Sequence, residues 1–377
     1  MMSKTRIRSN AAATSLMAAA LILAGCATTS TQGVLSLVEL SERLEERGVD
    51  AYHLVVPYLV SEEMERWARD VTRGPLNAEE KLIKLQLALL DPSAMQVRYQ
   101  WGYTGTAVEV FEQRVANCLA FTNLFVGMAR VLDVPVYFLG VSDNESFRRE
   151  GDLIIISDHI AVGYGRLSER QIFDFSENPP DDYHGFQEIS DLTAIAMFHS
   201  NRGAEILQTG NAGIAKQWLE LAVQIDPELA NAWVNLGVAR RRAGDNDGAE
   251  QAYRQALTID PRTQSAYQNL VSLLRIQGRH DEATAYQEAL ASTPTRNPYT
   301  YLSLGDLSLM SGRRDEAAIF YQKAVRLNPD DPEPYAALGQ VALDTGDVKR
   351  ARRMLKKARK MGVHPRANRL ETNLRIQ

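Results

Sequence analysis

Residues 233–261, WVNLGVARRRAGDNDGAEQAYRQALTIDP, are one unit of a pattern that recurs along the second half of the chain. The framework positions combine large apolar, small and turn-forming side chains, and they are Trp233, Leu236, Gly237, Gly244, Ala249, Tyr253, Ala256 and Pro261. A recurrence at a fixed spacing is typical of repeat proteins, in which each unit stacks on its neighbours. The stretch therefore predicts an all-α repeat array for this half of the chain.

The same positions return in four further units. The basic repeat spacing is 34 residues, the separation of Pro227 and Pro261. Two units downstream they are Tyr301, Leu304, Gly305, Gly312, Ala317, Tyr321, Ala324 and Pro329. The last unit has Tyr335, Leu338, Gly339, Gly346, Ala351 and Ala358, and the first has Gly203, Gly210, Ala215, Ala222 and Pro227. The middle unit keeps Tyr267, Leu270, Gly278 and Ala283. Its second helix is predicted to be one residue short, because Pro294 comes one position too early after Pro261 and Pro329 restores the spacing.

This pattern resembles the tetratricopeptide repeat over residues 196–365, in five units. Small residues let the two helices of each hairpin approach closely, glycine turns the chain after the first helix, and proline stops the second. The resemblance implies a concave groove that binds a protein or peptide partner. An array that only rigidifies or dimerises the protein is the alternative. Residues 366–377 are predicted to be a C-terminal tail.

The N-terminal residues 1–25 resemble a secretory signal, in which three basic residues precede the apolar run AAATSLMAAALILAG. The run leads into Leu23-Ala24-Gly25-Cys26, which resembles a bacterial lipobox. The resemblance implies that Cys26 is lipidated, that residues 26–34 are a tether, and that the protein is anchored in the cell envelope. Ala27 in place of Asp implies the outer membrane. An ordinary signal peptide with a chance cysteine is the alternative.

Charge and motif content exclude several other classes of function. The formal net charge of −5 argues against a general nucleic-acid binder. The basic stretch KRARRMLKKARK, residues 349–360, has no interleaved aromatics and is predicted to be the solvated face of the last repeat helix. Contact with anionic lipid headgroups is the alternative for this stretch. Histidines without metal-ligand spacing, and the lack of a phosphate-binding glycine motif, predict neither metal nor cofactor.

Residues 35–195 carry a different pattern, with helices predicted at 61–73, 78–90, 106–113 and 118–132. Strands are predicted at 136–141, 153–156, 159–164 and 171–175. Cys118 opens the last of the helices, where the positive end of the helix dipole stabilises a thiolate. Since Cys26 would be acylated, Cys118 has no disulfide partner and is either packing or a nucleophile.

A nucleophile needs a base, and a base needs a residue that orients it. The two strands that flank the turn at Arg166 are predicted to pair with Ala161 opposite Ile172. In that register His159 lies opposite Asp174, close enough for a carboxylate to hold an imidazole.

Three stretches carry a second resemblance: FEQRVANCLAFTNLFVGMARVLDVPVYFLGV at 111–141, SDHIAVGY at 157–164 and IFDFS at 172–176. Cys, His and Asp in this order are similar to the transglutaminase-like superfamily of papain-like cysteine enzymes, over roughly residues 100–180. The resemblance implies an α+β domain that precedes the repeat superhelix. It also implies that Cys118 is the nucleophile, His159 the general base and acid, and Asp174 the residue that orients His159.

The oxyanion of acyl transfer would be bound by the Cys118 backbone N–H and by an upstream side chain, for which Gln100, Trp101 and Gln113 are candidates. Leu119 replaces the Trp of animal cross-linking enzymes, which leaves peptidase or amidase chemistry open. The sequence thus predicts an exported cysteine hydrolase or acyltransferase that acts on peptide or isopeptide bonds. A non-catalytic interaction scaffold is the alternative, and a peptidoglycan-directed amidase is compatible with the predicted compartment.

Overall fold

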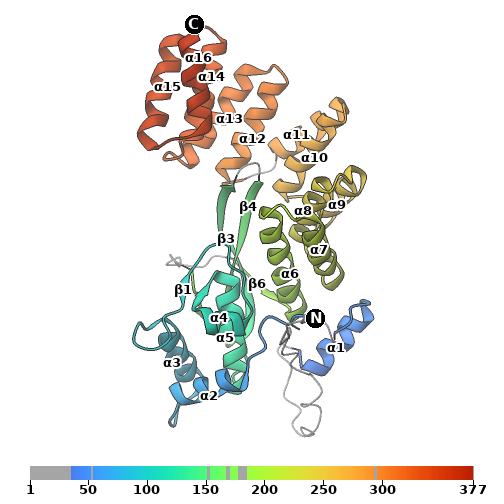
Figure 1. Ribbon diagram of the computed structural model, residues 1–377, viewed down its shortest axis with the longest axis vertical. Helices are drawn as coiled ribbons and strands as arrows, with labels where there is room; N and C mark the ends of the chain where they lie inside the picture. Colours follow the sequence, from blue (N-terminus) through green and yellow to red (C-terminus); the bar gives the residue numbers. More distant parts are fainter. Residues whose placement is uncertain are drawn as a thin grey trace, which may run out of the picture.

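The computed structural model describes residues 35–51, 54–150, 153–166, 170–176, 185–292 and 295–376, and only the backbone of 142–150 and 153–159. These residues form sixteen helices and six strands in an elongated molecule (Figure 1). The helical array occupies one end and the mixed α/β region the other. The predicted signal and Cys26 lie outside the described residues.

The described part of the N-terminal region contains five helices, α1 (Leu37–Glu46), α2 (Glu62–Val71), α3 (Ala78–Leu90), α4 (Ala107–Gln113) and α5 (Cys118–Val131). The four helices predicted in this region are confirmed as α2 to α5, and α1 was not predicted. Ser61, Asn77 and Thr106 cap α2, α3 and α4, because each side chain accepts a hydrogen bond from the third backbone N–H of its helix.

A four-stranded antiparallel sheet follows, in the order β5-β4-β3-β6. Its strands are β3 (Tyr137–Glu150), β4 (Leu153–Tyr164), β5 (Gln171–Phe173) and β6 (Phe186–Ile189). The strands predicted at 153–156 and 159–164 are one continuous strand, β4. A separate parallel pair joins β1 (Arg98–Tyr99) to β2 (Val115–Ala116), just before α5.

Among the described residues, the array consists of five helical hairpins and a last helix that packs on the fifth. The hairpins are α6 (Asp191–Gln208) with α7 (Ala212–Ile225), α8 (Ala230–Arg242) with α9 (Asn246–Ile259), α10 (Gln264–Ile276) with α11 (His280–Ser292), α12 (Pro298–Met310) with α13 (Arg314–Leu327), and α14 (Pro332–Asp344) with α15 (Val348–Met361). We call them repeats 1 to 5. The predicted shortening is confirmed, because α11 has 13 residues and α9 and α13 have 14.

Two predicted boundaries differ from the structure. The predicted start of the repeats between residues 195 and 196 falls inside α6, which begins at Asp191 because Ser190 caps it. Residues predicted as a tail form α16 (Pro365–Ile376), whose Leu370 and Leu374 are buried against repeat 5. An apolar face was needed to cover the last hairpin, as in the terminal units of repeat arrays.

Glycine has two different uses in the array. The turn between the two helices of each hairpin contains a glycine with φ between 75° and 86°, namely Gly210, Gly244, Gly278, Gly312 and Gly346. Gly237 and Gly305 instead permit close packing, because a Cβ on either would lie 2.4 Å from Cε1 of Tyr253 or Tyr321. The two tyrosine rings therefore pack against their helices in the same way.

The N-terminal region and repeat 1 share one hydrophobic core, which includes Ile225 of α7 together with residues of α2, α3 and α5. A buried ion pair joins α5 to α6, since Arg130 contacts both carboxylate oxygens of Asp191 at 2.8 and 2.9 Å. Tyr58 adds a hydroxyl 3.4 Å from Asp191, and the Arg130 guanidinium lies over its ring. Repeat 1 is therefore fixed to the N-terminal region by both apolar and charged contacts.

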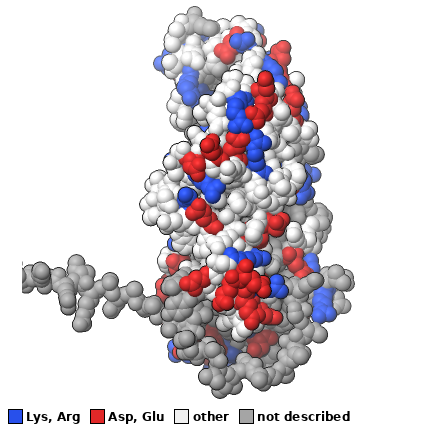
Figure 2. Space-filling model, turned by 90° about the vertical axis from the view of Figure 1, so that its right-hand side faces the viewer, with Lys and Arg blue, Asp and Glu red and all other residues white. Residues whose placement is uncertain are grey.

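The basic stretch of α15 is exposed as predicted, and only Ala351, Met354 and Ala358 of that helix are buried. On the face of the molecule seen in Figure 2, acidic and basic side chains are interspersed, with an acidic cluster in its lower part. Among the described residues, no helix combines the length and apolar character that crossing a bilayer demands.

Candidate functional site

Cys118 is the first residue of α5, as the sequence predicted. Asn117 caps the helix, because its Oδ1 accepts a hydrogen bond from the Ala120 N–H at 2.9 Å. The other end of the same carboxamide donates to Thr104 Oγ1 at 2.8 Å. Cys118 is 6% exposed, and its place at the helix start is fixed by a side chain that is itself held at both ends.

A hydrogen-bonded chain connects this helix start to repeat 1. The Thr104 N–H donates to Glu205 Oε1 of α6 at 2.7 Å, and Thr104 also accepts the bond from Asn117. Burial raises the pKa of Glu205, while the Thr104 bond and the charge of Arg202 oppose that shift. The first repeat helix thus helps to position the loop that precedes the candidate nucleophile.

The segments that carry the three predicted catalytic residues converge. One turn after Cys118, Phe121 stacks on Phe175 with ring centroids 4.1 Å apart. The next residue, Thr122, donates a hydrogen bond of 3.5 Å to the Ile160 carbonyl. The first turn of α5 therefore contacts the residue next to His159 and the residue next to Asp174.

The predicted strand register was wrong by two residues. Ile172 lies opposite Gly163, and not opposite Ala161, and Phe173 lies opposite Val162. Continued along both chains, this register sets Ala161 against Asp174. The turn between β4 and β5 is centred one residue later than predicted, because β4 continues to Tyr164 and β5 starts at Gln171. The offset is even, so the alternation of the two strands is the one predicted.

His159 lies in β4, where its backbone pairs with Val141 of β3, and its side chain is outside the described residues. Asp174 follows β5 and is half-buried, and its Oδ1 accepts the Ser176 N–H at 2.7 Å. Phe173 and Phe175 on either side of it both pack against Phe125 of α5. Asp174 therefore lies between two residues that pack on the helix that begins at Cys118.

The three candidates for the oxyanion site differ in position. Trp101 lines the same cavity as Cys118, and its indole N–H is a hydrogen-bond donor. Gln100 has an exposed side chain, although its N–H bonds the Ala116 carbonyl at 2.8 Å. Gln113 is exposed at the last turn of α4. Of the three, Trp101 is the one that the structure places with Cys118.

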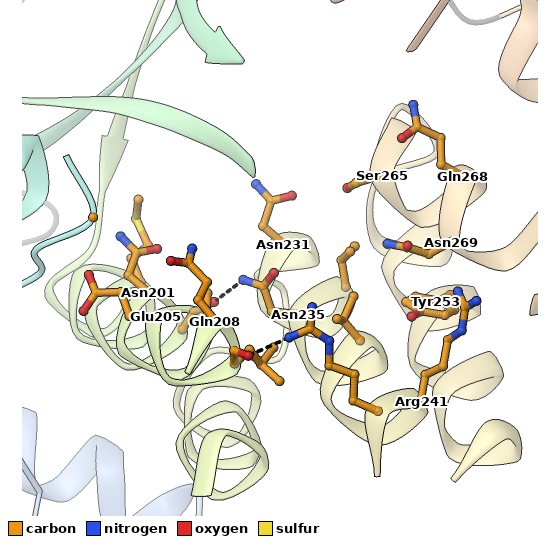
Figure 3. Close-up of a pocket in the computed structure, with 18 of the residues that line it drawn as sticks. Asn201, Glu205, Gln208, Asn231, Asn235, Arg241, Tyr253, Ser265, Gln268 and Asn269 are labelled. Carbon is orange, nitrogen blue, oxygen red and sulfur yellow. Dashed lines mark hydrogen bonds between the residues drawn. The ribbon is translucent and has the colours of Figure 1, made fainter. Parts of the chain in front are cut away.

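Cys118 lines one end of a cavity of about 730 Å³ that continues along the inner face of the repeats. Most of the wall is formed by the first helices of repeats 1 to 4, which are α6, α8, α10 and α12, and Tyr253 of α9 also lines the cavity. Figure 3 shows carboxamides that project from three of these helices, including Asn201, Asn235 and Asn269. The candidate nucleophile and the repeat groove therefore belong to one site.

Sequence reasoning missed this connection and the polar lining of the groove. The three asparagines recur at the basic repeat spacing, with Ser303 at the next equivalent position. That recurrence was visible in the sequence, but the alignment followed the apolar framework and not the polar positions. Joining the groove to Cys118 required the packing of α6 against the loop at Thr104, which no local pattern predicts.

Comparison with known families agrees with this division of the chain. Residues 65–153 match the model of the transglutaminase-like superfamily, and residues 212–332 and 308–374 match models of the tetratricopeptide repeat. The chain combines a transglutaminase-like domain with tetratricopeptide repeats. The transglutaminase-like match begins earlier than the resemblance read from the sequence. It includes Cys118 and ends before His159 and Asp174.

Several solved structures resemble parts of the chain. A structure from the functional characterization of Pseudomonas aeruginosa pilF is 26% identical, covers 48% of this chain and 82% of its own, and has a TM-score of 0.42. PilW, described as a type IV pilus biogenesis factor, is 20% identical with coverages of 48% and 84% and a TM-score of 0.42. YrrB, described as having an unusual peptide-binding site, is 16% identical with coverages of 47% and 92% and a TM-score of 0.36. No curated protein matches the chain significantly.

Proposed function

We propose that the protein is a cysteine-dependent acyl-transfer enzyme that acts on polypeptides bound in the repeat groove. One observation carries the proposal: Cys118 lines the same cavity as the inner faces of four repeats. A polypeptide ligand bound along the repeats would extend to the Cys118 thiol. The match of residues 65–153 to a superfamily that includes cysteine enzymes supports the chemistry.

In the proposed reaction the Cys118 sulfur attacks an amide carbonyl carbon, and His159 accepts the thiol proton. The Cys118 N–H and the Trp101 indole N–H stabilise the oxyanion. The C–N bond then breaks, His159 returns the proton to the leaving amine, and a thioester remains on Cys118. Water or another amine attacks this thioester and restores the thiol. Asp174 acts in this scheme only through His159, by orienting its ring.

The asparagine ladder, defined as Asn201, Asn235 and Asn269, supports a polypeptide as the ligand. A carboxamide offers one donor group and one acceptor, the same pair as a peptide unit. Adjacent packed helices are about 8–10 Å apart, and three residues of an extended chain span about 10 Å. Asn201 and Asn269 have no hydrogen-bond partner among the described residues, whereas Asn235 donates to Ser200 at 3.0 Å. The ladder would thus contact the backbone of an extended chain at every third residue.

We also propose that a lipid on Cys26 holds the protein at the bacterial cell envelope. The lipobox-like sequence at Cys26 is the observation that supports this anchor, and its test is mass spectrometry of the exported protein. An unmodified Cys26 in that protein would contradict the anchor and leave the acyl-transfer proposal unaffected.

The enzymatic proposal is tested by alkylation of a Cys26→Ser protein, in which Cys118 is the one remaining thiol. Limiting iodoacetamide should alkylate the folded protein at pH 7 at least tenfold faster than it alkylates the His159→Ala variant. Asp174→Asn should give an intermediate rate, since it changes only the orientation of His159. If Cys118 reacts only after unfolding, the enzyme is excluded and the interaction scaffold is left.

A further inference from the structure

Repeats 2 and 4 share a tyrosine framework but differ at its polar end. Tyr253 packs against Gly237 in repeat 2, and Tyr321 packs against Gly305 in repeat 4. In both repeats a Cβ added to the glycine would lie 2.4 Å from the tyrosine Cε1. In repeat 4 the residue after the glycine is Asp306, and Tyr321 donates its hydroxyl to Asp306 Oδ1 at 2.6 Å. In repeat 2 the corresponding residue is Val238.

The carboxylate of repeat 4 also binds a guanidinium. Arg366 of α16 contacts Asp306 Oδ1 at 2.6 Å and the Tyr321 hydroxyl at 3.0 Å. Tyrosine hydroxyl, carboxylate and guanidinium thus satisfy one another at the far end of the groove. When an acid is present at the position after the glycine, its carboxylate therefore binds both the tyrosine hydroxyl and a guanidinium.

Repeat 2 has the hydroxyl and a guanidinium but no acid at that position. Tyr253 lines the cavity and is fully buried, and its hydroxyl has no hydrogen-bond partner among the described residues. Arg241, one helical turn after Val238, also lines the cavity and donates to Ser272 Oγ at 3.2 Å. Within the described part of the chain no carboxylate lies within ion-pair distance of Arg241.

Repeat 3 shows that these two positions can meet. The residues equivalent to Arg241 and Tyr253 are Arg275 and Gln287, each one basic repeat spacing further along. Arg275 Nη2 donates to Gln287 Oε1 at 2.9 Å. In repeat 2 burial raises the pKa of Tyr253, and the charge of Arg241 and a side-chain contact between Arg241 and the hydroxyl oppose that shift. Arg241 can therefore approach the hydroxyl of Tyr253 by the same route across the hairpin.

We propose that Tyr253 and Arg241 form a binding subsite for a carboxylate of the polypeptide in the groove. The ligand carboxylate has the role that Asp306 has in repeat 4: it approaches from the cavity beside Val238, accepts the Tyr253 hydroxyl and pairs with the Arg241 guanidinium. Charge-assisted bonds of this kind are roughly twice as strong as neutral ones, so one carboxylate would fix the register of the chain on the asparagine ladder. The other acids of the cavity are already engaged, Glu205 by Thr104 and Asp306 by Tyr321 and Arg366.

The subsite rests on the proposed function, because it assumes a polypeptide in the groove. It is tested separately from catalysis, because peptide binding is measured in the Cys118→Ser protein. Randomised decapeptides that carry a fluorophore without a carboxylate, such as boron-dipyrromethene, are prepared in three pools: a free C-terminal carboxylate without Asp or Glu, a C-terminal amide with one Glu, and an amide without acids. Anisotropy should show at least tenfold tighter binding for one of the first two pools than for the third. The tighter pool identifies the source as a chain terminus or a side chain.

Tyr253→Phe and Arg241→Gln should each remove that preference, and the matched Tyr321→Phe variant should keep it. Equal binding of the three pools, no binding of any pool, or a preference that survives Arg241→Gln would overturn the proposal.

A second test needs no ligand. Val238→Asp places a carboxylate at the position of Asp306, whereas Val234→Asp places one a turn earlier on the same cavity wall. Both valines are buried, at 9% and 5% exposure. The melting temperature should fall clearly less in Val238→Asp than in Val234→Asp, and Val238→Asp should lose the carboxylate preference. An equal fall in both variants would contradict the subsite.

Discussion

Repeat 2 and repeat 4 place a tyrosine against a glycine in the same way, but only repeat 4 supplies its own acid. The hydroxyl of Tyr321 is bonded to Asp306, while the hydroxyl of Tyr253 is buried without a partner among the described residues. Buried polar groups are normally hydrogen-bonded, and an exception calls for an explanation. The difference is the basis of the proposed subsite, in which the framework that contributes to stability in repeat 4 would bind a ligand in repeat 2. Two pairs of substitutions test this comparison directly, and the pH dependence of stability tests the burial of a polar group in repeat 1.

The largest effect is expected from Arg366→Ala. Burial disfavours the charge of Arg366, but Asp306, Tyr321 and Glu333 outweigh it and raise the pKa of the guanidinium. Removal of one member of a buried pair costs about 3–5 kcal/mol, and the lower end applies because the Asp306 side chain is 31% exposed. Urea denaturation should show a loss of roughly 3 kcal/mol for Arg366→Ala and under about 1 kcal/mol for the control Arg241→Ala. Similar losses would remove the contrast between the two repeats.

A smaller effect is expected from pH, through a histidine of repeat 1. His199 of α6 is buried, and burial lowers its pKa to about 4 although its bond to the Val55 carbonyl opposes this. The unfolded chain takes up a proton near pH 6.5, so stability is full above that pH and falls as the pH decreases towards 4. His199 should contribute a loss of about 2 kcal/mol between pH 7.5 and pH 5.

The control for this prediction is His199→Gln, which keeps an N–H donor and does not titrate in this range. Urea denaturation at both pH values should show a smaller acid loss in the variant than in the original protein. Equal acid losses would mean that His199 is not buried in its neutral form.

The smallest effect compares the two tyrosines directly. Tyr321→Phe removes a hydrogen bond to a charged group and should cost about 1.5 kcal/mol. Tyr253→Phe removes a hydroxyl without a described partner and should change stability by less than about 0.5 kcal/mol. Thermal or urea denaturation of the two variants measures the difference. A larger cost for Tyr253→Phe would mean that its hydroxyl is already satisfied within the protein.

Local patterns predicted much of this structure. The helix that begins at Cys118, the glycine turns and the short α11 follow from capping, φ preference and spacing, which depend on neighbouring residues. The register of β4 and β5 was wrong by two residues, because it depends on where the turn begins. The start of α6 at Asp191 is set by the local cap Ser190, a signal that an alignment on the apolar repeat positions does not use. The cavity that joins Cys118 to the repeats required long-range packing, and the roles of His159 and Asp174 stay predictions.

The shared core of the N-terminal region and repeat 1 has a consequence for the order of folding. Ile225, which packs in that core, follows Cys118 by more than a hundred residues. Chains are synthesised from the N-terminus at about 5–20 residues per second, and domains generally fold as units. The N-terminal region must therefore wait several seconds for α7 to leave the ribosome before its core is complete. A nascent chain stalled before Ile225 would expose apolar surface, and this makes repeat 1 an internal template for the domain that precedes it.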